Sequence, residues 1–443
     1  MVNHLLPLLR LAPNSNLARG LPIYEESRFI LPYWSYIFGY GRPTTYLILL
    51  QNDTEMRANG GFFGSYAVVT LTEGVMETRF QDIYVPDGQL GGGHVEAPKP
   101  VEEAFGNGGY MLRDTDWEPD FEISAKTIRW FFEKGEEINP DVMMTVSLST
   151  IKKILQIVGP IVLDDYQLTI DETNVFNLVQ AKVETDFFPG STQKKEILSD
   201  LGQALLTKLE SLPLKKKLEI ANILWQEAKR KNILVNSTNL EFQSILKTNQ
   251  LTGSLRYPNC TGKVCTLDTY LAVESNLGAN KANCCTRRVT THKITDNQDY
   301  YTHDVEIFYT NDSSEENPKL PDFFGGNYID YLRLFIPGNS TNIQIEAEPT
   351  LPTTTGYPAP YTNDASRLES QEYEGFKMFG LFHITRAGSS SRVLLRYDLP
   401  KITMPYELHI LKQHGMVSSS QIILIGEKRV ETNLEDDFVL SGE

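Results

Sequence analysis

The hydrophobic pattern of the chain changes near residue 290, and this change constrains the fold more than any other feature. Before it, strand-like apolar runs at 45–51, 66–71 and 142–147 are interleaved with helical patterns, which dominate 124–230. An interleaved order of strands and helices is typical of an α/β or α+β layer fold. Pro213 is expected to begin one of two neighbouring amphipathic helices in this region. We therefore predict an α+β or α/β N-terminal domain.

After the change, short runs of β-branched and aromatic residues alternate with turn residues rich in Gly, Pro and Ser. The runs lie at 304–309, 331–336, 343–346, 379–384, 392–397, 406–411 and 422–425. About seven short strands with alternating faces are typical of an immunoglobulin-like sandwich. We predict an all-β sandwich of this kind.

These patterns predict four segments along the chain. They are an N-terminal helical lead-in (1–43), an α/β domain (44–288), a β-sandwich domain (289–430) and a frayed acidic tail (431–443). The two domains are expected to meet at 286–296, with Asn276 to Asn283 lining the junction. One sheet that continues across 286–296 would contradict this boundary.

The charge balance argues against nucleic acid as a partner. The 443 residues include 41 Lys and Arg against 57 Asp and Glu, a formal net charge of −16. Such a field repels phosphate backbones, and the longest basic run, Lys215 to Lys217, is typical of a solvated helix face. The apolar start from Met1 to Leu11 is interrupted by polar and proline residues, so it makes a poor signal peptide.

Four cysteines lie close together in the sequence. Cys260 and Cys265 flank a short Gly-containing loop, and Cys284 and Cys285 are adjacent. Adjacent cysteines do not easily reach one tetrahedral zinc ion, so we favour a disulfide, most simply Cys260 to Cys265, over a metal site. A disulfide indicates an oxidising, extracytoplasmic compartment.

Five blocks in order resemble DUF4012, a family of uncharacterised bacterial envelope proteins. The first block, 46–65, reads YLILLQNDTEMRANGGFFGS, and the later blocks lie at 113–121, 158–162, 275–283 and 406–415. Members of this family typically carry an N-terminal membrane helix. The resemblance therefore implies a cell-envelope location and membrane contact through an N-terminal anchor that this sequence lacks.

The N-terminal blocks are also distantly similar to the LytR-CpsA-Psr family, which transfers glycopolymers linked to polyprenyl pyrophosphate. This resemblance implies a phosphate site of Arg57, Arg113, Lys194 and Lys195, with Asp82 and Arg57 as catalytic residues. Arginine forks match phosphate oxygens, and a carboxylate can hold Mg²⁺ or accept a proton. Mg²⁺ is the one cofactor that the resemblance implies, and the metal ligands stay unassigned.

A structural interpretation of the same residues competes with this one. Glu55 and Arg57 stand two apart on one face of an extended segment and can pair with each other, while Lys194 and Lys195 are ordinary charges near a helix start. The alternating acids from Asp114 to Asp120 are interpreted as a solvated loop rather than a Ca²⁺ site, because the Gly and terminal Glu of an EF-hand are missing.

Two functions therefore stay open at this point. The first is an extracytoplasmic envelope protein that binds or transfers a glycopolymer linked to polyprenyl pyrophosphate. The second is a non-catalytic surface scaffold or glycan-binding protein that uses the C-terminal β-sandwich.

Overall fold

The computed structural model describes residues 28–89, 95–135, 137–175, 192–262, 264–313, 325–348 and 368–441. The chain forms two compact units, each made of separate segments. The first unit contains Met1–Asn52, Phe63–Gly91 and Asp120–Ser254. The second contains Asp53–Phe62, Gly92–Pro119 and Leu255–Glu443. Of the predicted lead-in, residues 1–27 lie outside the described part, and the rest holds the 3₁₀ helix η1 (Arg28–Tyr33) and α3 (Trp34–Ile37).

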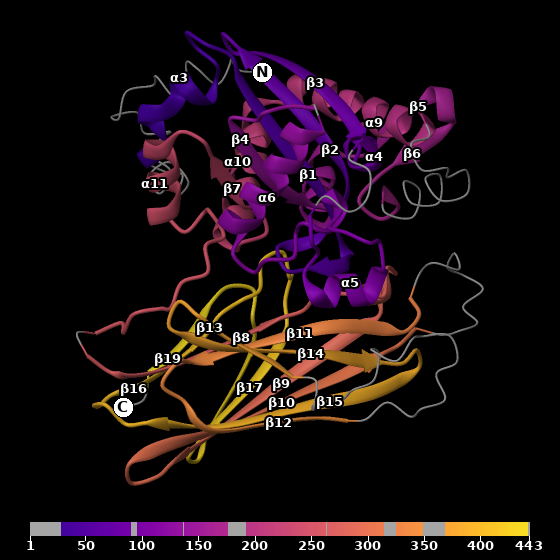
Figure 1. Cartoon of the computed structure of the whole chain (residues 1–443). Helices are drawn as coiled ribbons and strands as arrows, with labels where there is room; N and C mark the ends of the chain where they lie inside the picture. Colours follow the sequence, from indigo (N-terminus) through magenta and orange to yellow (C-terminus); the bar gives the residue numbers. More distant parts are fainter. Residues whose placement is uncertain are drawn as a thin grey trace. The chain divides into compact units, whose positions relative to one another are not determined.

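The first unit is built on a five-stranded sheet with the order β3-β2-β1-β4-β7 (Figure 1). Its strands are β1 (Thr44–Arg57), β2 (Gly60–Thr72), β3 (Val75–Asp82), β4 (Val142–Ser147) and β7 (Val235–Ser237). β1 and β4 are parallel, whereas β2 pairs with β3 and β4 pairs with β7 in antiparallel fashion. A small antiparallel sheet joins β5 (Ile161–Leu163) to β6 (Leu168–Ile170).

Helices alternate with these strands along the chain. They are α4 (Tyr84–Gln89), α6 (Phe121–Lys134), α7 (Leu148–Val158), η3 (Asp164–Tyr166), α9 (Thr192–Ser211), α10 (Leu214–Lys229) and α11 (Leu240–Thr248). α6 begins where the Asp120 carboxylate accepts a hydrogen bond from the Glu122 amide, and α10 begins directly after Pro213. Ile154 and Val158 of α7 pack with Ile220 of α10. The predicted mixed α/β domain is therefore confirmed.

The second unit contains two six-stranded sheets (Figure 1). The β10 sheet has the order β12-β15-β10-β9-β17-β18, and the β11 sheet has the order β13-β14-β11-β8-β16-β19. The strands of the β10 sheet are β9 (Thr286–Asp296), β10 (Tyr300–Asn311), β12 (Thr341–Ala347), β15 (Ser389–Pro400), β17 (Ser420–Ile425) and β18 (Lys428–Asn433). Those of the β11 sheet are β8 (Thr266–Val273), β11 (Tyr328–Pro337), β13 (Glu369–Tyr373), β14 (Phe376–Thr385), β16 (Tyr406–Ile410) and β19 (Phe438–Ser441).

The two sheets share one apolar core. Val305 and Leu395 of the β10 sheet belong to the same buried cluster as Leu332 and Leu408 of the β11 sheet. The unit also holds α5 (Lys99–Phe105), η2 (Leu112–Asp114) and η4 (Ala282–Cys284). Burial alternates along β10, where the odd-numbered residues from Tyr301 to Tyr309 point into this core. The even-numbered residues therefore lie on the outer face of the β10 sheet.

The immunoglobulin-like arrangement is not confirmed. β8 runs parallel to β16, and β9 runs parallel to β17, so both sheets mix parallel and antiparallel pairs. The immunoglobulin sandwich is built from antiparallel sheets. Alternation along one strand shows which residues face inward, but it does not show the direction of the neighbouring strand.

Two predicted boundaries are wrong. The main division falls between Ser254 and Leu255, and the β11 sheet continues across 286–296 because β8 already belongs to it. The predicted acidic tail is not frayed, since β18 pairs with β17, and β19 pairs with β16. Glu431 of β18 and the loop acids Glu435 and Asp436 are exposed, and this gave the segment the composition of a tail. None of the described helices is long and apolar enough to cross a membrane.

Candidate functional site

Arg57, predicted to bind phosphate, lies buried in the second unit at the end of β1. Its Nη2 donates to Oε1 of Glu55 at 3.0 Å, and its Nη1 donates to the backbone carbonyl of Asn276. The guanidinium carbon lies 5.6 Å from the ring centre of Phe62 and 5.9 Å from that of Phe105. These contacts match the structural interpretation, in which Glu55 and Arg57 pair with each other.

The acidic loop beside Arg57 is buried rather than solvated, contrary to the sequence interpretation. Asp114 and Asp116 are 6% and 1% exposed, respectively. Burial raises the pKa of Asp116 well above its usual range, and the charge of Arg57 acts in the opposite direction. Arg113, which is half-buried in η2, also belongs to this unit.

The remaining predicted site residues belong to the first unit. Asp82 is buried at the end of β3, where its Oδ1 accepts a hydrogen bond from the Tyr84 amide at 3.0 Å. Lys194 and Lys195 lie in the first turn of α9, and their side chains are outside the described part. The predicted catalytic and phosphate-binding residues are thus divided between the two units. Among the described residues, no group of three or more His, Cys, Asp and Glu side chains forms a metal site.

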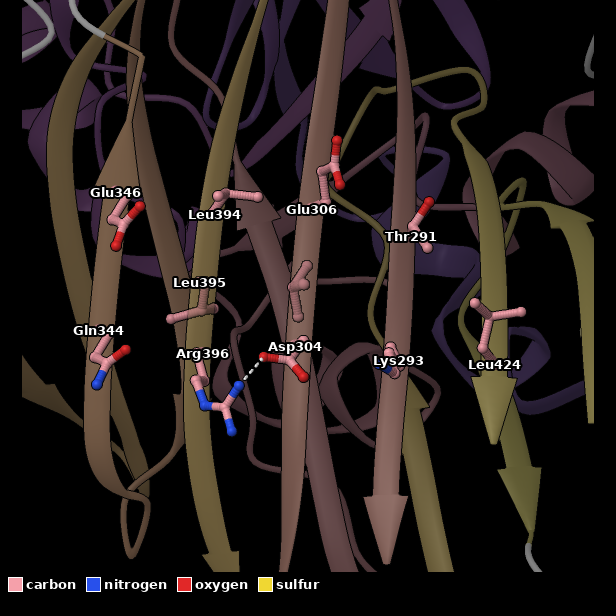
Figure 2. Close-up of a pocket in the computed structure, with 11 residues that line it drawn as sticks. Thr291, Lys293, Asp304, Glu306, Gln344, Glu346, Leu394, Leu395, Arg396 and Leu424 are labelled. Atoms are coloured by element: carbon pink, nitrogen blue, oxygen red, sulfur yellow. Dashed lines mark hydrogen bonds and ion pairs between the residues drawn. The ribbon is translucent and has the colours of Figure 1, made fainter. Parts of the chain in front are cut away.

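A depression of about 310 Å³ lies on the outer face of the β10 sheet (Figure 2). The first of its two rows crosses four neighbouring strands. Glu346 of β12 stands opposite Leu394 of β15, which stands opposite Glu306 of β10, and Glu306 stands opposite Thr291 of β9. Both glutamates therefore flank one half-buried leucine.

The second row lies two residues further along the same strands. Gln344 stands opposite Arg396, Arg396 opposite Asp304, Asp304 opposite Lys293, and Lys293 opposite Leu424 of β17. Arg396 Nη1 donates to Asp304 Oδ1 at 3.0 Å. Figure 2 marks this contact with a dashed line. The depression therefore combines apolar surface with an amide, a hydroxyl and charges of both signs. Such a mixture can bind a polar ligand that also has an apolar face.

Sequence reasoning placed β10 and β15 correctly but did not identify this site. The alternation at 304–309 and 392–397 was the available signal, since it separates outward-facing charges from inward-facing apolar residues. It gave no information about strand order, and the depression exists only because β12 and β9 lie beside these strands.

Both cysteine pairs form disulfides. Cys260 and Cys265, the predicted pair, are bonded with their Cα atoms 5.8 Å apart. The adjacent residues Cys284 and Cys285 are also bonded to each other, which the sequence analysis did not predict. No free cysteine is present among the described residues.

The comparison with known families agrees with the first resemblance. Residues 42–183 match DUF4012, a family described as proteins of unknown function. The match covers the blocks at 46–65, 113–121 and 158–162, and the two later blocks lie beyond it. No curated protein matches the chain in sequence.

Several solved structures resemble the chain at low identity. TagV of B. subtilis, a LytR-CpsA-Psr family member, is 17% identical with a TM-score of 0.28, covering 48% of this chain and 81% of its own. Lin1025 of Listeria innocua is 12% identical with a TM-score of 0.26, covering 47% and 79%. The transcriptional regulator EF0465 of Enterococcus faecalis is 13% identical with a TM-score of 0.27, covering 48% and 72%. Because these TM-scores are low, the likenesses carry no inference about activity, substrate or partner.

Proposed function

We propose that this chain is an extracytoplasmic cell-envelope protein that binds a cell-wall glycan on the outer face of the β10 sheet without transferring it. The depression beside Leu394 carries this proposal. A sugar ring offers an apolar C–H face together with hydroxyl groups that donate and accept hydrogen bonds. The depression has matching features, because Leu394 and Leu424 supply apolar surface and Gln344 and Thr291 supply donors and acceptors.

The two disulfides support the extracytoplasmic part of the proposal. Disulfides persist in oxidising compartments and are rare where thiols are kept reduced. Here, Cys260–Cys265 and Cys284–Cys285 are both formed.

The transferase hypothesis has weaker support. A pyrophosphate on Arg57 would have to replace bonds that its guanidinium already makes to Glu55 and to the Asn276 carbonyl. Breaking a buried ion pair leaves an uncompensated charge and is strongly unfavourable. Binding of a short-chain polyprenyl pyrophosphate with Mg²⁺ present, lost in Arg57→Ala, would favour transfer over our proposal.

Co-sedimentation with purified, insoluble cell-wall glycan tests the binding function. Wild-type protein is expected to sediment with the glycan, and Leu394→Arg is expected to stay in the supernatant because a long cation then fills the depression. Val439→Arg is the matched control, since Val439 is 41% exposed on β19 of the other sheet.

Two results would contradict the proposal. One is wild-type protein that stays in the supernatant at every glycan concentration. The other is equal loss of binding in Leu394→Arg and Val439→Arg, with both variants folded by circular dichroism, because the outer face of the β10 sheet would then have no special role.

A further inference from the structure

Two carboxylates face the depression from strands that are not neighbours. Glu306 on β10 and Glu346 on β12 both stand opposite Leu394 on the intervening strand β15. Strands in a sheet lie about 4.8 Å apart, so the two glutamate backbones are roughly 10 Å apart. Side chains of this length can reach toward each other over the leucine. Figure 2 shows the three residues in one row across the sheet.

Neither carboxylate has a hydrogen-bond or ion-pair partner within the part of the chain that the structure describes. The two guanidinium groups that flank Leu394 along β15 are already paired, Arg396 with Asp304 at 3.0 Å and Arg392 with Glu348 at 2.9 Å. Lys293 stands opposite Asp304 on the far side of β10 from Leu394. The charged residues that line the depression are three acids, Asp304, Glu306 and Glu346, and two bases, Lys293 and Arg396, so the balance beside Leu394 is net negative.

This charge pattern selects among glycans. A uronic acid or a phosphate-bearing unit would place an anion between two carboxylates, which is unfavourable. A neutral sugar can donate hydroxyl hydrogen bonds to the carboxylates, but it brings no positive charge to offset theirs. An ammonium group can donate charge-assisted hydrogen bonds to both carboxylates, and such bonds are the stronger class of hydrogen bond.

We propose that the depression binds a hexosamine unit with a free amine, whose ammonium group lies between Glu306 and Glu346 while the ring lies on Leu394. This inference deepens the glycan-binding function proposed above and rests on it. The two carboxylates then recognise the sugar by the positive charge of its amine. N-acetylation of the same sugar removes this charge.

The test compares two oligosaccharides that differ in the amine alone. Isothermal titration uses a β-1,4-linked glucosamine hexamer and its fully N-acetylated counterpart, at a mildly acidic pH at which the amine is protonated. We expect the amine form to bind at least about tenfold more tightly, as charge-assisted hydrogen bonds allow. Added salt is expected to reduce this difference, because screening weakens exposed charge interactions.

Isosteric variants assign the effect to the two carboxylates. Glu306→Gln and Glu346→Gln are each expected to weaken binding of the amine form about tenfold and to leave binding of the acetylated form unchanged. Glu372→Gln is the matched control, because Glu372 is an exposed glutamate on β13 of the other sheet. It is expected to bind both forms as the wild type does.

Equal affinity of the wild type for both hexamers would overturn this inference, as would unchanged binding of the amine form by both glutamine variants. In that case, the glycan-binding function would still be supported if the wild type sediments with the cell-wall glycan and Leu394→Arg does not. Absence of sedimentation by the wild type itself would instead overturn the broader function. The two failures are therefore distinguishable.

Discussion

His383 is a histidine held neutral inside the second unit, and it makes stability depend on pH. It lies on β14 with no exposed surface, and its Nε2 is hydrogen bonded to Oγ of Ser391 at 3.1 Å. Burial lowers the pKa of His383 to about 3. In the unfolded chain a histidine titrates near 6.5, so the unfolded state binds a proton that the folded state does not. The contribution to stability is present above pH 6.5 and is lost as the pH falls toward 3.

A comparison with His383→Asn isolates this contribution. Between pH 7 and pH 4.5, the wild type is expected to lose about 2–3 kcal/mol more of its free energy of unfolding than the variant does. Urea unfolding followed by near-ultraviolet circular dichroism measures both curves. Asp116 and Asp330, whose pKa values are raised by burial, act in the opposite direction, but they are present in both proteins. Parallel pH curves would show that His383 titrates equally in the folded and unfolded states.

Asp268 is a second buried polar side chain, and it shows why the burial of a charged residue is hard to predict from the sequence. Asp268 of β8 accepts hydrogen bonds from the hydroxyls of Tyr397 at 2.6 Å and Tyr406 at 2.7 Å, and its Oδ2 lies 3.0 Å from Nδ1 of His303. Burial alone would raise the pKa of Asp268, but these partners outweigh it and hold the pKa below its usual value. In the sequence, an aspartate inside an apolar run indicates the end of a strand. The partners that allow Asp268 to be buried lie on three other strands, so the neighbouring sequence does not reveal them.

At the scale of elements, the predictable part of the fold is the set of strands with clear alternation. The runs at 304–309 and 392–397 lie within β10 and β15, and four of their outward residues, Asp304, Glu306, Leu394 and Arg396, line the depression. β8 was missed because its residues are buried on both faces, so no period of two appears. Strand order depends on pairing between distant segments. The sequence therefore could not predict that Glu346 and Glu306 lie on either side of the same strand.

The Cys260–Cys265 disulfide closes a loop that is tied to β16. Oγ1 of Thr261, inside the loop, donates to Oε1 of Glu407 at 2.6 Å, and its amide donates to Oε2 at 2.8 Å. Because a disulfide restricts the unfolded chain, Cys260→Ser with Cys265→Ser is expected to lower the free energy of unfolding by about 2 kcal/mol for so short a loop. Urea unfolding of the double variant measures this change.

The second disulfide supplies the control for that measurement. Reductant is expected to destabilise the wild type, and in the Cys260→Ser, Cys265→Ser protein any remaining effect of reductant reports on Cys284–Cys285 alone. A double variant as stable as the oxidised wild type would show that the Thr261–Glu407 contacts fix the loop without the covalent bond.

At the scale of the whole molecule, the division into units was predicted incorrectly because it is not sequential. The second unit takes Asp53–Phe62 from the ends of β1 and β2 and Gly92–Pro119 from between β3 and α6. A change in hydrophobic periodicity along the chain can reveal one domain boundary. It cannot reveal a segment that lies between two parts of one unit in the sequence and belongs to the other unit in the fold. Burial of the loop around Asp116 is a consequence of this insertion.

The inserted segment predicts how an isolated C-terminal fragment behaves. Ala97, Val101 and Trp117 of Gly92–Pro119 belong to one buried cluster with apolar residues of β11 and β14, and the guanidinium carbon of Arg333 lies 4.2 Å from the ring centre of Trp117. A fragment of residues 255–443 lacks this cover. It is expected to bind a hydrophobic dye and to lose near-ultraviolet circular dichroism, because Tyr331 and Phe382 become exposed.

Trp117→Ala in the full chain removes one packing contact of the inserted segment and keeps the segment itself, so it separates the effect of this contact from the effect of deleting the segment. Removing a buried tryptophan side chain is expected to cost about 3–5 kcal/mol, so this variant should unfold at a lower urea concentration while keeping its near-ultraviolet signal in buffer. If the 255–443 fragment instead unfolds cooperatively and binds no dye, the strands from β8 onward suffice for a folded unit. In that case Gly92–Pro119 would be an addition to its surface and not a part of its core.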